Sequence, residues 1–406
     1  MDDVLLTGVG VLSCLGSGVD AFWEGLNKAD SLPTRVPDPH ADMPYPLMYL
    51  VPEADLPTGP KEQDGLPLGR GSQYAIEAAR QAVADAGLVA PGAGPAAVDP
   101  RRVAVSIGTG MGDARLQEEQ RVSGAAGAAG DRWAPTFSVA SVVGGWFGAQ
   151  GANSSCSNAC AASGYSLSVA ADLIRAGEAD VVIAGGAESY SRVALACFNR
   201  LGAIDPDRCR PFAAERKGTL FGEGAAVMVL ESAEHARRRG VKKAYARLAG
   251  AGWSCDAHHA TAPEPAGEQI ERAMRQAMDE AGARPGPGGG VGFVVAHGTG
   301  TGLNDVVESQ VLTTVLGEEA RTPVYAPKAV LGHTGGAAGA FSALTAALIL
   351  HHGSVPPNPP MGALDPECAI HLPTDAPTPL SGTYGLINAY AFGGNNVTLV
   401  LGEATL

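Results

Sequence analysis

The chain has 406 residues, of which 45% are hydrophobic and 17% charged, and its formal net charge is −14. This length allows two or three domain-sized units, and the negative balance excludes a nucleic-acid partner, which needs a concentrated basic face. The longest apolar run, around residues 340–350, is too short to cross a bilayer, and the acidic start lacks the basic segment of a secretory signal. We therefore expect a soluble, cytoplasmic protein with no membrane partner.

The seven cysteines are odd in number and scattered, as is typical of reduced thiols in a cytosol. Cys156 and Cys160 stand four residues apart in CSNACAASG, residues 156–164. A zinc site would need a second cysteine pair or a histidine pair at ligand spacing, and neither accompanies them. No metal site is expected.

Four segments of the first half recur, in the same order, in the second half. The matched pairs in chain order are LTGVGVLS (6–13) with LAGAGWS (248–254), SIGTGMG (106–112) with AHGTGTG (296–302), CAASGYSLSVAADLI (160–174) with GAAGAFSALTAALIL (336–350), and AAVMVLE (225–231) with VTLVLGE (397–403). The third pair is expected to form buried helices and the others strands or strand ends. The repeat predicts a duplicated α/β unit, residues 1–245 and 246–406, with mostly parallel sheets and helices on their faces. The charged stretch 234–247 between the halves is expected to be the tail of a solvated helix.

Residues that break the repeat are candidates for function. At the strand end the first half has Ile107 where the second has His297, and at the helix start the first half has Cys160 where the second has Gly336. Each half thus supplies one reactive group where its twin is inert.

Cys160 is expected to be the nucleophile. A thiol at a helix start faces unpaired backbone N–H groups and the positive end of the helix dipole, which lower its pKa. The small neighbours Ala161, Ala162 and Gly164 leave room for an acyl chain, and nearby N–H groups could hold an oxyanion. Cys156 precedes the helix and is interpreted as a packed core thiol.

His297 and His333 follow apolar strands and precede glycine-rich turns, as loop-borne catalytic groups often do. Lys328, five residues before His333, would be unusual at a buried strand start unless it were paired. The stretches GTGMGD and GTGTG do not fit a nucleotide-binding pattern.

NACAASG, AHGTGT, KAVLGHTGGAAGA and NAYAFGGNN, in this order, resemble the β-ketoacyl-acyl-carrier-protein synthases of the thiolase superfamily. The chain is most similar to the synthase II and type II polyketide ketosynthase branches, over nearly its whole length. The resemblance implies a duplicated five-layered α/β/α/β/α sandwich that dimerises, either with itself or with a ketosynthase-like chain-length-factor subunit.

The resemblance also implies a reaction. Cys160 would take an acyl group from an acyl-carrier protein, His297 and His333 would assist decarboxylation of malonyl-carrier protein, and Lys328 would order the site. A Claisen condensation would then give a β-ketoacyl-carrier protein two carbons longer. No cofactor of its own is implied, because phosphopantetheine arrives on the carrier.

Further roles follow from the same motifs. Thr299 and Thr301 match positions that contact the phosphopantetheine arm. Phe392, next to Gly393, matches a gating residue, and its N–H would join that of Cys160 in an oxyanion hole. Met111 would help to line the acyl pocket near the dimer interface.

Three features depart from the synthase II pattern: Asn158 replaces a common threonine, Ser342 replaces a glutamate, and the carrier-docking segment 61–71 carries fewer positive charges. Candidates for a basic docking patch are Arg200, Arg208, Arg210, Arg216 and Lys217, although neighbouring acids also permit a plain surface network. The departures favour polyketide or polyene assembly. Housekeeping fatty-acid elongation, acyl transfer without elongation and a non-catalytic chain-length-factor role remain alternatives.

Overall fold

The computed structural model describes residues 3–88, 98–122, 135–286, 288, 290–317 and 321–405. The longer strands are β1 (Val4–Ser13), β7 (Val103–Gly108), β8 (Asn153–Cys156), β9 (Val181–Glu188), β11 (Gly224–Ser232), β12 (Ala246–Cys255), β13 (Val291–Val295), β17 (Tyr384–Ala391) and β18 (Asn395–Gly402). The helices are α1 (Val19–Lys28), α2 (Arg70–Asp85), α3 (Ala114–Val122), α4 (Ser138–Phe147), α5 (Ala162–Arg175), α6 (Arg192–Leu201), α7 (Ala233–Arg238), α8 (Glu268–Ala281), α9 (Gly302–Leu316), α10 (Lys328–Leu331) and α11 (Ala338–His352). Short strands are β2 (Gly16–Ser17), β3 (Thr34–Arg35), β4 (Leu47–Tyr49), β5 (Glu62–Gln63), β6 (Leu66–Pro67), β10 (Phe221–Gly222), β14 (Val324–Tyr325), β15 (Ser354–Val355) and β16 (Thr378–Pro379), and the 3₁₀ turns are η1 (Glu53–Asp55), η2 (Pro100–Arg102), η3 (Ala159–Ala161), η4 (Gly335–Ala337) and η5 (Phe392–Gly394).

The large sheet consists of two five-stranded halves with the same strand order. The first half runs β8-β7-β9-β11-β1 and the second runs β14-β13-β17-β18-β12, while β2 pairs only with β1. The halves join where β1 pairs with β12, from Val4 opposite Leu248 to Leu6 opposite Ala246. This identical order is the structural form of the sequence repeat.

The expectation of mostly parallel sheets is wrong. In each half the two outer pairs are parallel and the two pairs nearest the junction are antiparallel. Only the three residues of η5 separate β17 from β18. A parallel crossover needs a dozen or more residues, so this connection can only produce an antiparallel pair.

The strand register also corrects two of the sequence matches by one residue. Leu12 pairs with Ala225, and its counterpart Ser254 pairs with Asn396, so Ala225 corresponds to Asn396. Carried across the sheet through β9 and β17, the register places Gly108, not Ile107, in the position of His297. Side-chain packing selects this register, because a shift of one residue would turn every side chain of the strand to the opposite face of the sheet.

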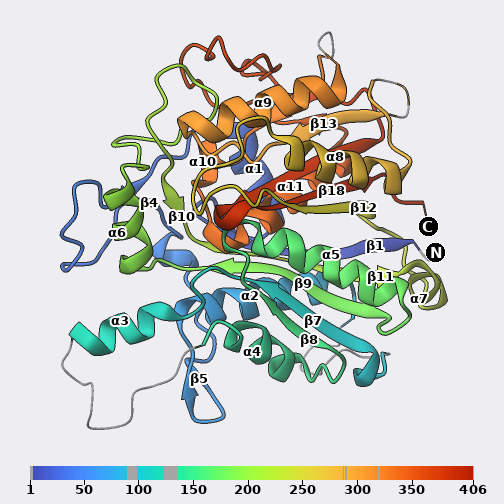
Figure 1. Ribbon diagram of the computed structural model, residues 1–406. Helices are drawn as coiled ribbons and strands as arrows, with labels where there is room; N and C mark the ends of the chain where they lie inside the picture. Colours follow the sequence, from blue (N-terminus) through green and yellow to red (C-terminus); the bar gives the residue numbers. More distant parts are fainter. Residues whose placement is uncertain are drawn as a thin grey trace.

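Helices cover both faces of both sheet halves (Figure 1), so the molecule has five layers. α2 and α4 pack on the outer face of the first half, and α8 and α9 lie over the second. α5 and α11 contact each other between the two halves. The predicted α/β/α/β/α sandwich is confirmed.

Three apolar cores separate these layers. The middle core takes alternate strand residues such as Val182 and Ile387, while their neighbours Ile183 and Leu386 enter the two outer cores. α11 is buried on all sides over residues 338–349, which explains why its sequence lacks a polar face.

Close packing explains the glycines that made the repeat visible. A Cβ atom at Gly8 would lie 2.2 Å from the carbonyl oxygen of Ala82 in α2. At the matching position, a Cβ at Gly250 would lie 2.2 Å from the carbonyl oxygen of Ala277 in α8. Both outer helices therefore approach the strand backbone so closely that only glycine fits.

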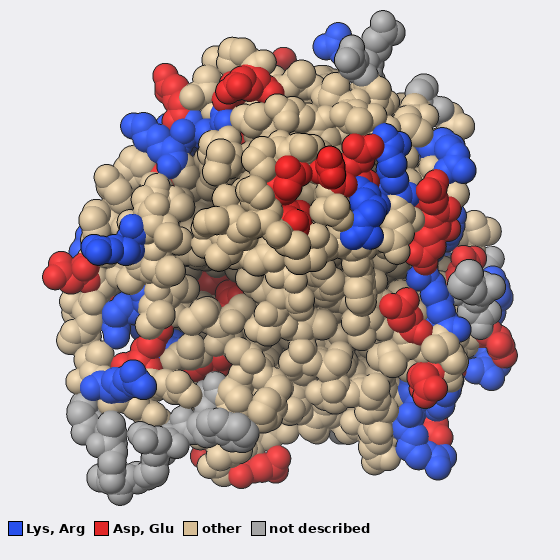
Figure 2. Space-filling model, viewed as in Figure 1, with Lys and Arg blue, Asp and Glu red and all other residues tan. Residues whose placement is uncertain are grey.

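The charged stretch between the halves differs from its prediction. α7 begins at Ala233, ends at Arg238 and buries His235 and Ala236, so the segment is not simply solvated. Arg239 binds the buried Glu231. On the face shown in Figure 2, lysines and arginines lie among aspartates and glutamates rather than in one basic patch. Within the described part of the chain, no helix has both the length and the apolar character needed to cross a membrane.

Candidate active site

Cys160 lies in the 3₁₀ turn η3, between the end of β8 and the start of α5. The preceding residue, Ala159, has φ +46°, a left-handed conformation that disfavours residues with a side chain. This turn places the Cys160 side chain at the boundary of two cavities. Cys156 ends β8 and is half-buried there, whereas the sequence predicts a packed core thiol.

The environment of the Cys160 thiol differs from the prediction. Burial raises its pKa to about 11, and the Glu188 carboxylate acts in the same direction. Lys328 and the backbone N–H groups of Cys160 and Phe392 lower the pKa, but they do not outweigh burial. A pKa near 11 contradicts the predicted low-pKa thiolate and makes the sulfur a thiol at neutral pH.

His297 follows β13, and two backbone contacts fix it. The N–H groups of His297 and Gly298 donate to the two carboxylate oxygens of Glu308, each at 2.8 Å. Glu308 is fully buried in α9 and also accepts a hydrogen bond from Asn388. One turn earlier in α9, the buried Asp305 accepts from the N–H of Thr299 at 3.0 Å and so holds the rest of the loop.

Lys328 and His333 belong to one short segment. Lys328 is the first residue of α10, not the start of a strand, and His333 follows that helix rather than an apolar strand. The Lys328 Nζ atom donates to the carbonyl oxygen of His297 and lies 3.3 Å from His297 Nδ1. Because Lys328 faces Nδ1, the ring proton of His297 is placed on Nε2.

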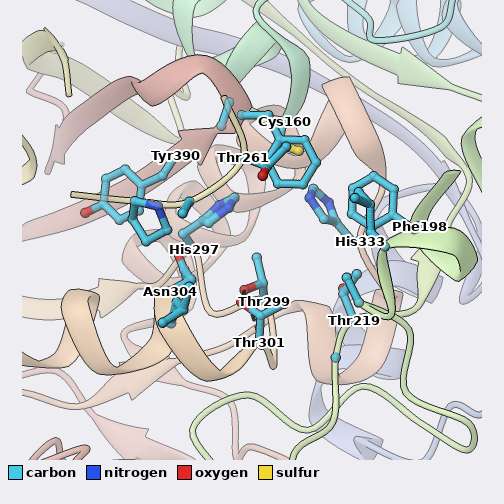
Figure 3. Close-up of a pocket in the computed structure, with 18 of the residues that line it drawn as sticks. Cys160, Phe198, Thr219, Thr261, His297, Thr299, Thr301, Asn304, His333 and Tyr390 are labelled. Carbon is cyan, nitrogen blue, oxygen red and sulfur yellow. Dashed lines mark hydrogen bonds between the residues drawn. The ribbon is translucent and has the colours of Figure 1, made fainter. Parts of the chain in front are cut away.

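Both histidines are kept neutral. Burial lowers the pKa of His297 and of His333 well below the usual histidine value, and the nearby Lys328 lowers both further. Their rings lie 5.7 Å apart, centroid to centroid, at 89°. Figure 3 shows Cys160, His297 and His333 pointing into one space, with Thr299 and Thr301 on the neighbouring wall. In such a site the thiol can form a thioester, and the two neutral imidazoles can donate hydrogen bonds to an enolate oxygen.

The cavity that these residues line, here called the outer cavity, has a volume of about 410 Å³. Thr299 and Thr301 line it, and their hydroxyl oxygens lie 2.8 Å apart. A second, inner cavity of about 150 Å³ lies behind Cys160 and is lined by Met111 and other mostly apolar side chains. Cys160, Phe198 and Phe392 line both cavities, so they form the partition between them.

Phe392 stacks on Phe198 with ring centroids 5.3 Å apart and planes at 8°. Gly393 lies next to Phe392 with φ +81° but lines neither cavity. Its contribution is therefore backbone freedom beside Phe392 rather than a wall of the site.

Sequence reasoning missed three buried acids: Glu188, Asp305 and Glu308. Glu188 accepts hydrogen bonds from the N–H groups of Gly110 at 2.7 Å, Met111 at 3.0 Å and Gly336 at 2.7 Å, and so ties the two halves together beside Cys160. The available signal was an acid ending an apolar strand in VVIAGGAE and two acids one turn apart after GTGTG.

Two of the five residues proposed for the basic docking patch form ion pairs. Arg210 binds Asp205, and Arg216 binds Asp365. Lys217 lines the outer cavity. Segment 61–71 contains the small β5–β6 hairpin and, from Arg70, the start of α2.

The layered fold and the cysteine-histidine-histidine site together define a thiolase-like ketosynthase. The chain matches the family models described as Beta-ketoacyl synthase, N-terminal domain, over residues 57–236, and Beta-ketoacyl synthase, C-terminal domain, over residues 245–361. It therefore belongs to the β-ketoacyl synthase family, whose members are acyltransferases that form carbon–carbon bonds.

Individual relatives agree. The chain is 33% identical to a 3-oxoacyl-[acyl-carrier-protein] synthase 2 of Staphylococcus aureus (strain COL), over 98% of this chain and 97% of the relative. Among solved structures it resembles the ishigamide ketosynthase/chain length factor, with a TM-score of 0.89, 34% identity and full coverage of both chains. It also resembles a chain of the AntDE:AntF complex, described as a type II PKS acyl-carrier protein in complex with its ketosynthase, with a TM-score of 0.88 and 27% identity over 99% of this chain and all of that chain.

Proposed function

We propose that this chain is the elongating ketosynthase of a type II polyketide or polyene assembly system. The convergence of Cys160, His297 and His333 on one cavity, with Lys328 behind them, carries the proposal. The chemistry needs no cofactor held by this chain, because an acyl-carrier protein delivers the phosphopantetheine thioester.

In the loading step, the Cys160 sulfur attacks the carbonyl carbon of the acyl thioester. A sulfur–carbon bond forms, the phosphopantetheine thiol leaves, and the proton of Cys160 passes to it. The N–H groups of Cys160 and Phe392, which both face the sulfur, would hold the oxygen of the tetrahedral adduct.

In the condensation step, malonyl-carrier protein loses carbon dioxide, and the electron pair of the broken bond forms an enolate. Neutral His297 and His333 donate hydrogen bonds to its oxygen, which favours the charge developing there. The enolate carbon attacks the Cys160 thioester, the carbon–sulfur bond breaks, and the departing thiolate takes one proton from solvent water. The product is a β-ketoacyl-carrier protein two carbons longer.

The partners are an acyl-carrier protein and a second ketosynthase-like subunit. Two of the structural relatives are described as a ketosynthase/chain length factor and as a ketosynthase in complex with its acyl-carrier protein. Leu201 and Leu303 are exposed at the mouth of the outer cavity, beside Lys217. This mixture of apolar and cationic side chains suits an acidic carrier.

Fatty-acid elongation is the second candidate, since the Staphylococcus aureus relative, matched over nearly its whole length, is a 3-oxoacyl-[acyl-carrier-protein] synthase 2. The two functions differ in whether the chain works with a chain-length-factor-like partner and in whether the β-keto groups are retained. The fold and the residues around Cys160 are compatible with both.

The test uses purified protein, alone and with a chain-length-factor-like subunit, and supplies acyl- and malonyl-carrier proteins. We expect an acyl adduct on Cys160 by intact mass spectrometry, release of carbon dioxide, and a β-ketoacyl product. An adduct without carbon dioxide release would indicate acyl transfer without elongation. Absence of any adduct would indicate a non-catalytic partner subunit and would overturn the proposal.

A further inference from the structure

Asn158 lies two residues before the nucleophile, where the synthase II pattern has threonine. Its backbone is part of the η3 turn, because its carbonyl accepts the N–H of Ala161 at 3.1 Å. Its side-chain Nδ2 atom donates to Oδ1 of Asn395 at 3.4 Å. A side chain of the nucleophile's turn thus contacts the loop that carries Phe392.

Asn395 completes a connection to that loop. It begins β18 directly after Gly393 and Gly394, which both have left-handed backbones. Its Nδ2 atom donates to the carbonyl oxygen of Phe392 at 3.1 Å. Two hydrogen bonds in series therefore run from Asn158 through Asn395 to the backbone of Phe392.

The twin half has no such connection. In the register of the two sheet halves, Asn395 corresponds to Gly224, which has no side chain, and Asn158 corresponds to Thr334. Side chains that only support the duplicated fold should recur in both halves. This pair breaks the symmetry beside Cys160, as the reactive groups themselves do.

The connection acts on a segment that can move. Consecutive glycines give residues 393–394 a wide choice of backbone conformations. Phe392 stacks on Phe198 and completes the partition between the outer and inner cavities. An anchor at the Phe392 carbonyl would therefore bias the position of its ring.

We propose that Asn158 and Asn395 form an amide clasp, a pair of positioning residues that holds the Phe392 loop in the closed conformation relative to Cys160. This inference rests on the proposed function and on the gating role that the family resemblance implies for Phe392. Opening the gate requires the clasp to release, and closing restores it. The clasp therefore sets the ratio of open to closed conformations in this chain.

The experiment reads the ring directly. 4-Fluorophenylalanine is placed at position 392 of the full-length protein, and ¹⁹F chemical-exchange saturation transfer measures the populations of the stacked and unstacked ring. A Phe198→Leu variant supplies the reference signal for a ring that has lost its stacking partner. Loss of one neutral hydrogen bond changes a two-state ratio by about two- to twelvefold, so Asn158→Ala and Asn395→Ala should each raise the open-to-closed ratio by an amount in that range.

Isosteric variants separate the two bonds. Asn158→Asp removes the donor to Asn395, and Asn395→Asp removes the donor to Phe392, while each keeps the size of the side chain. Each should reproduce the corresponding alanine variant. The double alanine variant should open the gate no further than the larger single effect, because the bonds act in series. Asn27→Ala, whose amide caps the Trp23 carbonyl in α1, is the matched control and should leave the ratio unchanged.

An open population that is unchanged, or that stays undetected, in both alanine variants would overturn the clasp. So would an equal rise in the Asn27→Ala control. The fluorine signal does not depend on turnover, so the two proposals fail separately. If the variants shift the open population but the protein makes no β-ketoacyl product, the clasp stands and the proposed function is rejected. If the protein makes the product but the population does not shift, the proposed function stands and the clasp is rejected.

Discussion

The two helix-start turns, η3 with Cys160 and η4 with Gly336, have similar backbone conformations but different roles. Each begins with a residue in the left-handed region, Ala159 at φ +46° and Gly335 at φ +52°. A Cβ at Gly336 would lie 2.2 Å from the backbone nitrogen of Gly110, so no side chain fits there, whereas Cys160 faces two cavities. Duplication has left one turn as a support and the other as a site, and the support is joined to the site through Glu188.

The largest effect is expected from making the first turn as inert as the second. Cys160→Ala should abolish acyl-adduct formation and reduce condensation by at least about a thousandfold, because the covalent route is lost. The measurement is intact mass together with product formation. Cys156→Ala is the control four residues earlier and should retain most of the activity. Equal losses in both variants would show that the turn, rather than the sulfur of Cys160, matters.

The next largest effect is expected at Lys328, a residue of the second half. Lys328→Met should reduce condensation by about 10²–10³-fold, because the variant loses the contacts to the backbone and ring of His297 and leaves Glu308 without its nearby cation. Both kcat and KM are measured over a range of carrier-substrate concentrations, with thermal unfolding as the control for folding. A loss confined to KM would contradict this positioning role.

The pH dependence of Cys160 alkylation tests whether burial outweighs the helix start in setting the pKa of its thiol. With a thiol pKa near 11, alkylation of Cys160 by iodoacetamide should accelerate about tenfold per pH unit between pH 7 and 9, because only the thiolate reacts. Adduct mass at Cys160 gives the rate. A plateau by pH 8 would restore the low-pKa thiolate that the sequence suggests.

The smallest effect comes from exchanging the left-handed residues. Gly335→Ala should lower the free energy of unfolding by about 1–3 kcal/mol, because its Cβ would lie 2.7 Å from a Glu188 oxygen in a conformation that disfavours alanine. Ala159→Gly should raise it by about 0.5 kcal/mol, because strain is relieved at the cost of chain entropy. Denaturant unfolding measures both. Changes of equal sign would contradict the proposed symmetry of the two turns.

The sequence carries the fold where packing restricts residue type. Gly8 and Gly250 are required by helices that touch the strand backbone, so they recur and reveal the duplication. Strand direction depends on how the connections fold back, and the sequence records it where a connection is short, as in the three residues between β17 and β18. The matches at residues 107 and 225 were one position out because adjacent small and apolar residues look alike until burial assigns them to a face.

The candidate site was predicted only in part, because the sequence reveals some of its residues and not others. Cys160 and His297 stand out because they break the repeat. Glu308 and Glu188 do not, since their partners are backbone N–H groups, which every sequence supplies. The pKa of Cys160 follows from burial by residues distant in sequence, and a local view of a helix start cannot include it.

The carboxylate of Glu188 also has a consequence for synthesis of the protein. Two of its hydrogen-bond donors, Gly110 and Met111, are made before it, whereas Gly336 is made about 150 residues later. At ribosomal speeds of about 5–20 residues per second, that interval is on the order of ten seconds. During this time the acid lacks one partner, and the thiol of Cys160 lacks the second sheet half that encloses it. The emerging chain therefore carries an incomplete site with an accessible sulfur until its last third has left the ribosome.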